Sequence, residues 1–164
     1  MENQLWLDVL SRFTHVSTAI ALMGGSIFIL WVLIPSSTQL LDAEHQKLQE
    51  AVSSRWKRFI HLGILLFIAS GFYNYFRAMP NHKGDGLYHA LVGVKMILAL
   101  GVFFIASALV GRSKGLAFVR EKRVFWLRLL VTVAFVIVGI SSFVKVRGPG
   151  PVKTSAQVSE PQTK

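Results

Sequence analysis

Four long apolar stretches constrain the fold of this chain more than any other feature of its sequence. They cover residues 13–34, 59–75, 87–110 and 124–144. A helix rises about 1.5 Å per residue and needs about 20 apolar residues to cross the roughly 30 Å hydrocarbon core of a bilayer. The sequence therefore predicts four membrane-spanning helices.

The composition also favours a membrane protein. Hydrophobic residues make up 52% of the 164 positions, and the mean hydropathy is +0.50. A single small water-soluble domain has too little interior to hide four stretches of this length. No stretch alternates polar and apolar residues as a strand of an outer-membrane barrel does. We expect an all-α integral membrane protein whose helices run up and down as a four-helix bundle.

The bundle is expected to occupy residues 1–146 as one transmembrane domain. Pro35 is expected to end the first span. Residues 42–52 are amphipathic and predict a short interfacial helix, which either stops there or continues into the second span. Residues 147–164 are polar and have no apolar period, so we expect a flexible, disordered C-terminal tail.

The basic residues indicate the partners and the topology. The net charge is +10, and most Lys and Arg residues lie in the connections between the apolar stretches. That distribution leaves no basic surface for nucleic acid, whereas attraction to anionic lipid headgroups of the bilayer explains the charge. The first and third connections are the richer ones, so the positive-inside rule predicts a multi-pass protein with both termini outside. The oligomeric state, including a homo-oligomer, is left open.

The residue types exclude several kinds of chemistry. The chain has no cysteine, which excludes disulfides, thiolate metal sites, iron–sulfur clusters and covalently attached c-type haem. We find no nucleophile beside a base, no phosphate-binding loop and no paired carboxylates in a span. The sequence therefore does not decide whether the protein is an enzyme.

Two histidines give the sequence its main candidate site. His15 and His89 stand near the starts of the first and third stretches, which lie on one side of the membrane in an antiparallel order. His15 is 19 residues from Ile34, and His89 is 22 residues from Gly111. The difference of three residues is about 4.5 Å along a helix, which tilting can absorb. Two imidazoles at one depth near the outer face predict a site for haem b or copper.

Two basic residues accompany these histidines. Lys95 is six residues after His89, a rotation of about 240° on a helix, so the two side chains point to different faces. Lys95 either reaches outward to the headgroups or neutralises a carboxylate such as a haem propionate. Arg12, on the same face as His15, is a candidate for the same role at the rim.

The remaining candidates are weaker. Met23 and Met96 are potential thioether ligands for Cu(I), although methionine more often fills apolar space. His61 opens the second span and is expected to contact lipid phosphate or Arg58. His45 and His82 lie in connections and are expected to be solvated.

Other functions remain open at this point. The histidines near the interface are also compatible with an ancillary membrane protein that binds no cofactor. A copper permease would need a series of copper-binding side chains across the membrane. Four residues are candidates for this series: His15, Met23, Met96 and His61. Proton transfer would use His61 and Lys95, but no carboxylate lies within a span.

Residues 5–146 resemble a group of small bacterial membrane proteins. The group includes the membrane domain of copper resistance protein D and the four-helix HemJ-type protoporphyrinogen oxidase. The similar motifs are Arg12-Phe-Thr-His15, Met23-Gly-Gly-Ser-Ile-Phe28, Arg55-Trp-Lys-Arg-Phe59 and Tyr88-His89-Ala-Leu-Val-Gly-Val-Lys95. The resemblance implies the bacterial cytoplasmic (inner) membrane. It also implies that His15 matches a histidine involved in haem binding and that Lys95 loosely matches a lysine on the third helix. In that oxidase the last helix opens with an acidic-and-proline motif, where this chain has Trp126-Leu-Arg-Leu-Leu-Val.

Overall fold

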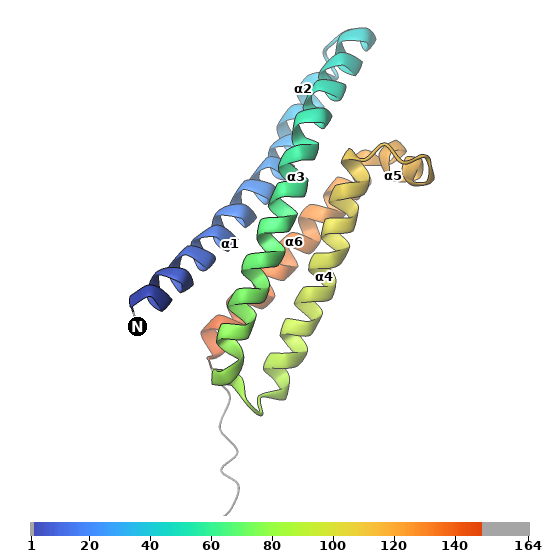
Figure 1. The fold of residues 1–164 in the computed structure, drawn as a ribbon. Coiled ribbons are helices and arrows are strands. Elements are labelled where there is room, and N and C mark those ends of the chain that lie inside the picture. Colours follow the sequence, from blue (N-terminus) through green and yellow to red (C-terminus); the bar gives the residue numbers. More distant parts are fainter. Residues whose placement is uncertain (1, 149–164) are drawn as a thin grey trace, which may run out of the picture.

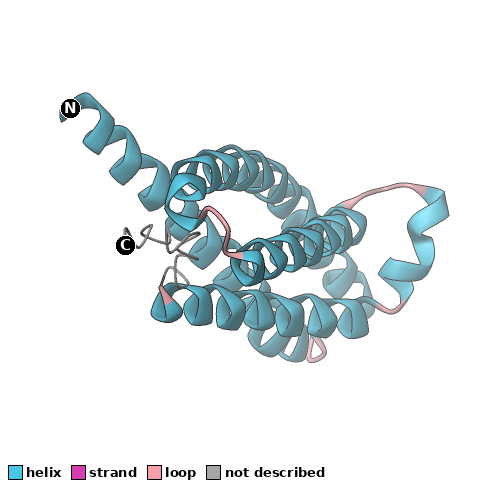
Figure 2. Cartoon of the chain, turned by 90° about the horizontal axis from the view of Figure 1, so that it is seen from below, coloured by secondary structure: helices cyan, strands magenta, loops and turns pink. Residues whose placement is uncertain are grey.

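The computed structural model describes residues 2–148, and every regular element within them is a helix. Figures 1 and 2 show these helices and the short connections between them. In chain order the elements are α1 (Glu2–Phe28), the π-helical turn η1 (Ile29–Leu33), α2 (Ile34–Ser37), α3 (Asp42–Ala78), η2 (Met79–His82), α4 (Gly86–Val110), η3 (Lys114–Leu116), α5 (Ala117–Glu121) and α6 (Arg123–Arg147).

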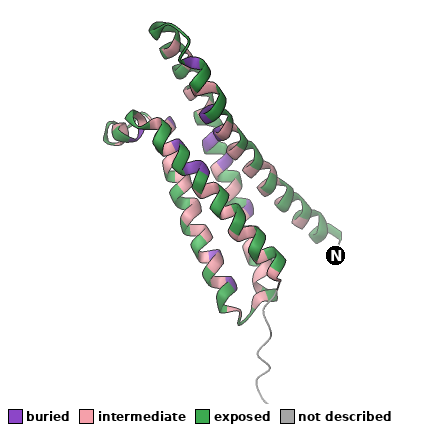
Figure 3. Cartoon of the chain, turned by 180° about the vertical axis from the view of Figure 1, so that it is seen from behind, coloured by how far each residue is buried: buried purple, intermediate pink, exposed green. Residues whose placement is uncertain are grey.

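Four helical segments are long and apolar enough to cross a membrane, as the sequence predicts. They are Glu2–Ser37, Asp42–His82, Gly86–Val110 and Arg123–Arg147. Few of their residues are buried by other helices (Figure 3), and many of the exposed residues are large and apolar. An apolar outer surface of this extent is typical of helices that face lipid.

The long helices pack in two main pairs, α1 with α3 and α4 with α6, and consecutive long helices run in opposite directions (Figure 1). One end of the molecule holds Glu2, the connection between α3 and α4, and Arg147; we call it the N-terminal end. The opposite end holds the turn at residues 38–41 and α5, and we call it the α5 end. The α3 helix extends well past α5 there.

The apolar core lies where η1 meets α6. Its buried side chains are Ile29, Leu30, Leu127, Leu130 and Val131. Small residues allow α1 and α3 to approach closely nearby, since Gly25 faces the ring of Trp56 and Gly63 faces Leu22.

Two helix boundaries differ from the expectations. Pro35 does not end the first helical segment, because helix continues to Ser37. The π-helical turn before it shifts the hydrogen-bond register, which is how a helix can accommodate a residue without an N–H. Residues 42–52 continue into the second span as the first turns of the 37-residue α3, since neither Gly nor Pro interrupts the chain between Asp42 and Leu62.

The α6 helix ends at Arg147, where Gly148 adopts a φ of +69°. That left-handed conformation suits glycine and stops the helix. Most of the predicted tail, residues 149–164, lies outside the described residues.

Candidate functional site

His15 is half-buried between α1 and α3. Its Nδ1 atom is 3.0 Å from Ser70 Oγ, and its ring centroid is 4.0 Å from that of Phe67. Gly71 leaves the space that the imidazole occupies, because a Cβ atom at that position would lie 3.2 Å from His15 Cε1. Three neighbouring residues of α3 thus fix the ring.

The hydrogen bonds of Ser70 determine which nitrogen of His15 carries the proton. The Ser70 hydroxyl has a single proton and donates it to the Leu66 carbonyl oxygen at 2.6 Å. Its oxygen must therefore accept a hydrogen bond from His15 Nδ1–H. Neutral imidazole has one protonated nitrogen, so Nε2 keeps a free lone pair. Such a nitrogen can bind a metal centre or accept a proton, and a hydrogen bond at the other nitrogen is the usual way a ligating histidine is oriented.

Lys95 is half-buried on α4 and lies within electrostatic range of His15. Among residues 2–148, the ion pairs involve other cations, so the described chain gives Lys95 no carboxylate partner. The structure therefore brings together His15 and Lys95, two of the residues singled out in the sequence.

Among the described residues, no hydrogen bond or ring contact joins His89 to His15. The Phe67 ring, which contacts His15, also contacts Phe103 on α4, with the two ring centroids 5.6 Å apart. His15 contacts α3, whereas the ring contact of His89 is with its neighbour Tyr88 on α4. The equal depth inferred from the sequence assumed that the helix ends are level. They are not level at the α5 end, where the turn at residues 38–41 and the start of α3 extend past the end of α4 (Figure 1).

The other candidate residues also lie apart from His15. Arg12 is exposed, and Met23 is two turns further along α1, about 12 Å from His15. Met96 is half-buried on α4. His61 is exposed, and its Nδ1 lies 2.7 Å from the Lys57 carbonyl oxygen. Within the described residues no three His, Cys, Asp or Glu side chains form a group that could hold a metal ion.

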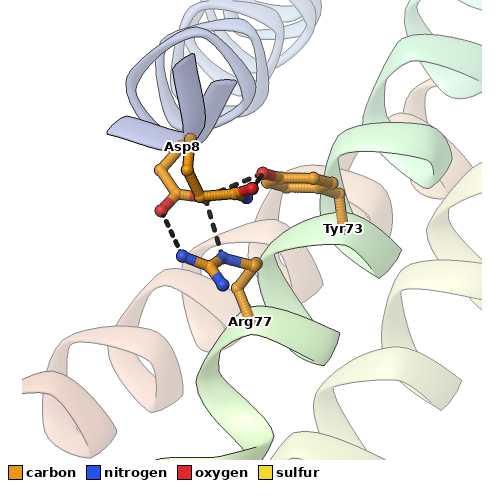
Figure 4. Close-up of polar contacts among 4 residues, drawn as sticks. Asp8, Tyr73 and Arg77 are labelled. Atoms are coloured by element: carbon orange, nitrogen blue, oxygen red, sulfur yellow. Dashed lines mark hydrogen bonds and ion pairs between the residues drawn. The ribbon is translucent and has the colours of Figure 1, made fainter. Parts of the chain in front are cut away.

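Asp8 forms a polar cluster with α3 that the sequence analysis missed (Figure 4). Arg77 donates to both of its carboxylate oxygens, at 2.9 Å and 2.7 Å, and the Tyr73 hydroxyl donates to Oδ1 at 2.8 Å. Asp8, Ser11 and His15 are spaced by three and four residues, which places them on one face of a helix. All three contact α3, so this spacing was the signal that could have identified the cluster.

A second cluster closes the N-terminal end beside α4. Asp85 accepts a hydrogen bond from the Tyr88 backbone N–H at 3.1 Å, as an N-cap residue does, and pairs with Arg147 at 2.9 Å. The His82 ring stacks on Tyr88 at 3.6 Å, so the expectation of a solvated His82 is wrong. His45 is likewise half-buried, with Nδ1 2.8 Å from the Ser37 carbonyl oxygen. The signal for Asp85 was its position directly before the third apolar stretch.

Comparison of the chain with protein-family models, curated proteins and solved structures finds no match. The site must therefore be interpreted from its own geometry. It consists of one oriented imidazole with a free nitrogen, a nearby ammonium group and the aromatic ring of Phe67.

Proposed function

We propose that this chain is a multi-pass membrane protein that binds haem b, with His15 as an axial ligand. The observation that carries the proposal is the hydrogen bond from His15 Nδ1–H to Ser70, which orients the ring and leaves the Nε2 lone pair free. A single proximal histidine is enough to hold haem iron in several classes of protein. The group would supply one-electron redox chemistry.

The residues around His15 fit such a group. Phe67 provides an aromatic surface next to the imidazole, and Phe103 packs against Phe67. Lys95 is a cation without a carboxylate partner among the described residues, and in this proposal it would pair with a haem propionate. Ser70 holds the imidazole tautomer that ligation requires.

Copper is the alternative for the same imidazole. It would need further ligands, and the two methionines named above lie on other turns or another helix. A haem needs fewer protein ligands, so the arrangement around His15 favours it.

The test is the absorption spectrum of the detergent-purified protein, first oxidised and then reduced with dithionite. We expect a Soret band that shifts on reduction and a resolved α band. His15→Ala should lose these bands, whereas His61→Ala, which changes an exposed histidine, should keep them. A colourless wild-type protein from haem-replete cells would refute the proposal, and stoichiometric copper without haem would favour the alternative.

A further inference from the structure

A basic groove lies at the α5 end, far from His15. It has a volume of about 830 Å³ and separates the first half of α3 from the segment that joins α4 to α6. Five cations and one carboxylate line it: Lys57, Arg58, Arg112, Arg120, Arg123 and Glu50. The cations come from both walls, so an anion within the groove would be surrounded by positive charge.

These cations are not neutralised by the described part of the chain. The ion pairs found among residues 2–148 join Asp8 to Arg77, and Asp85 to Arg147 and His82, all at the N-terminal end. The five groove cations therefore form no ion pair within the described residues, and they outnumber the one carboxylate, Glu50, that lines the groove with them.

Arg120 gives the clearest sign of such a partner. Its Nη2 donates to the Ser113 carbonyl oxygen at 2.8 Å, which fixes the guanidinium group. Its Nη1 is buried and has no hydrogen-bond acceptor within the described residues. Buried donors of charged groups are rarely left unpaired, because that loses the hydrogen bonds they make in water. Two N–H groups on Nη1 thus need an acceptor.

The position of the groove identifies the kind of anion. Arg112 follows the end of α4 by two residues, Arg123 begins α6, and Arg58 directly precedes the second apolar stretch. Cations at the ends of apolar helices lie at the depth of the lipid phosphates. Leu109 and Val110 add apolar lining on the same wall, which a lipid can contact and a soluble anion cannot use.

We infer that this groove binds the phosphate of an anionic phospholipid headgroup, with Arg120 and Arg123 as its main contacts. Planar guanidinium groups match phosphate oxygens in a two-pronged geometry. This site is independent of the proposed haem site, and either can fail without the other.

The test uses the full-length protein in detergent, titrated with short-chain phosphatidylglycerol, short-chain phosphatidylcholine or inorganic phosphate. The melting temperature reports binding. We expect phosphatidylglycerol to stabilise the protein at lower concentration than the other two probes. Arg120→Gln and Arg123→Gln should each weaken the apparent affinity for phosphatidylglycerol about tenfold.

Lys114→Gln is the matched control, because it removes one exposed charge at the same end without lining the groove. Its affinity should stay close to that of the wild type. Equal weakening by Lys114→Gln would show general charge attraction and overturn the site. Equal stabilisation by inorganic phosphate would assign the groove to a soluble anion instead, and equal stabilisation by phosphatidylcholine would remove anion recognition. Arg123→Gln keeps the test valid if Arg120→Gln disturbs the loop through Ser113.

Discussion

Two adjacent glycines on α1 should respond in opposite ways to the same substitution. Gly25 faces Trp56, and a Cβ atom added there would overlap the six-membered part of the indole ring. Gly24 has nothing within 4 Å of the same added atom. Both positions lie in the same turn of α1, so the change in helix propensity, about 1 kcal/mol in favour of alanine, is common to both.

The difference between the two variants therefore isolates the packing of α1 on α3. Forcing a methyl group into a filled contact costs about 1–3 kcal/mol, and a rigid indole cannot move aside as a flexible chain can. Gly25→Ala should thus be about 1–3 kcal/mol less stable than Gly24→Ala. The free energy of unfolding can be measured in mixed micelles with increasing dodecyl sulfate.

A second substitution checks the cause. Replacing Trp56 with phenylalanine removes the overlapping atoms, so Gly25→Ala should cost much less in that background. Equal stability of Gly24→Ala and Gly25→Ala would refute the close α1–α3 contact on which the position of His15 depends.

Three further predictions follow from the clusters and from the topology. Asp85→Ala removes the N-cap of α4 and leaves the partly buried Arg147 without its carboxylate partner. It should therefore lower the free energy of unfolding by about 2–4 kcal/mol. An effect below about 0.5 kcal/mol would contradict the importance of this ion pair. His89→Ala should retain haem in the purified protein, because no described contact joins His89 to His15 or to the residues that hold it. Loss of haem would instead support the paired-histidine expectation. The native chain has no cysteine, so single cysteines can report the topology. In intact cells a membrane-impermeant maleimide should label Asn81→Cys and not Gly115→Cys, because the positive-inside rule places α5 in the cytoplasm. The reverse labelling pattern would mean that the topology is inverted.

The sequence predicted the long helices well and their alignment poorly. Apolar stretches of about 20 residues are a local signal, and each one appears within a helix at the expected place. How far a helix continues beyond its apolar stretch depends on weaker signals. The polar turns that begin α3 and the helical turn around Pro35 lengthen the first two segments past α4. Counting from the ends of the apolar stretches therefore does not define the relative level of His15 and His89.

The α1 residues of the site could be predicted from the sequence. The spacing of Asp8, Ser11 and His15 marks one face of α1, and each of these side chains contacts α3. Which residues of α3 receive them depends on helix register, which sequence spacing does not define. The Ser70 hydroxyl, which settles the tautomer of His15, is one of several serines with no distinguishing local pattern.

Ligation through His15 can be tested directly with a cavity variant. His15→Gly removes the imidazole and leaves space beside Ser70 and Phe67 that free imidazole can enter. The measurement is the Soret and α-band spectrum of purified His15→Gly, supplied with haem in the presence or absence of imidazole. Axial ligation by His15 predicts no haem spectrum without imidazole and recovery of the wild-type spectrum with it. A His15→Gly protein that shows the wild-type spectrum without imidazole would contradict it.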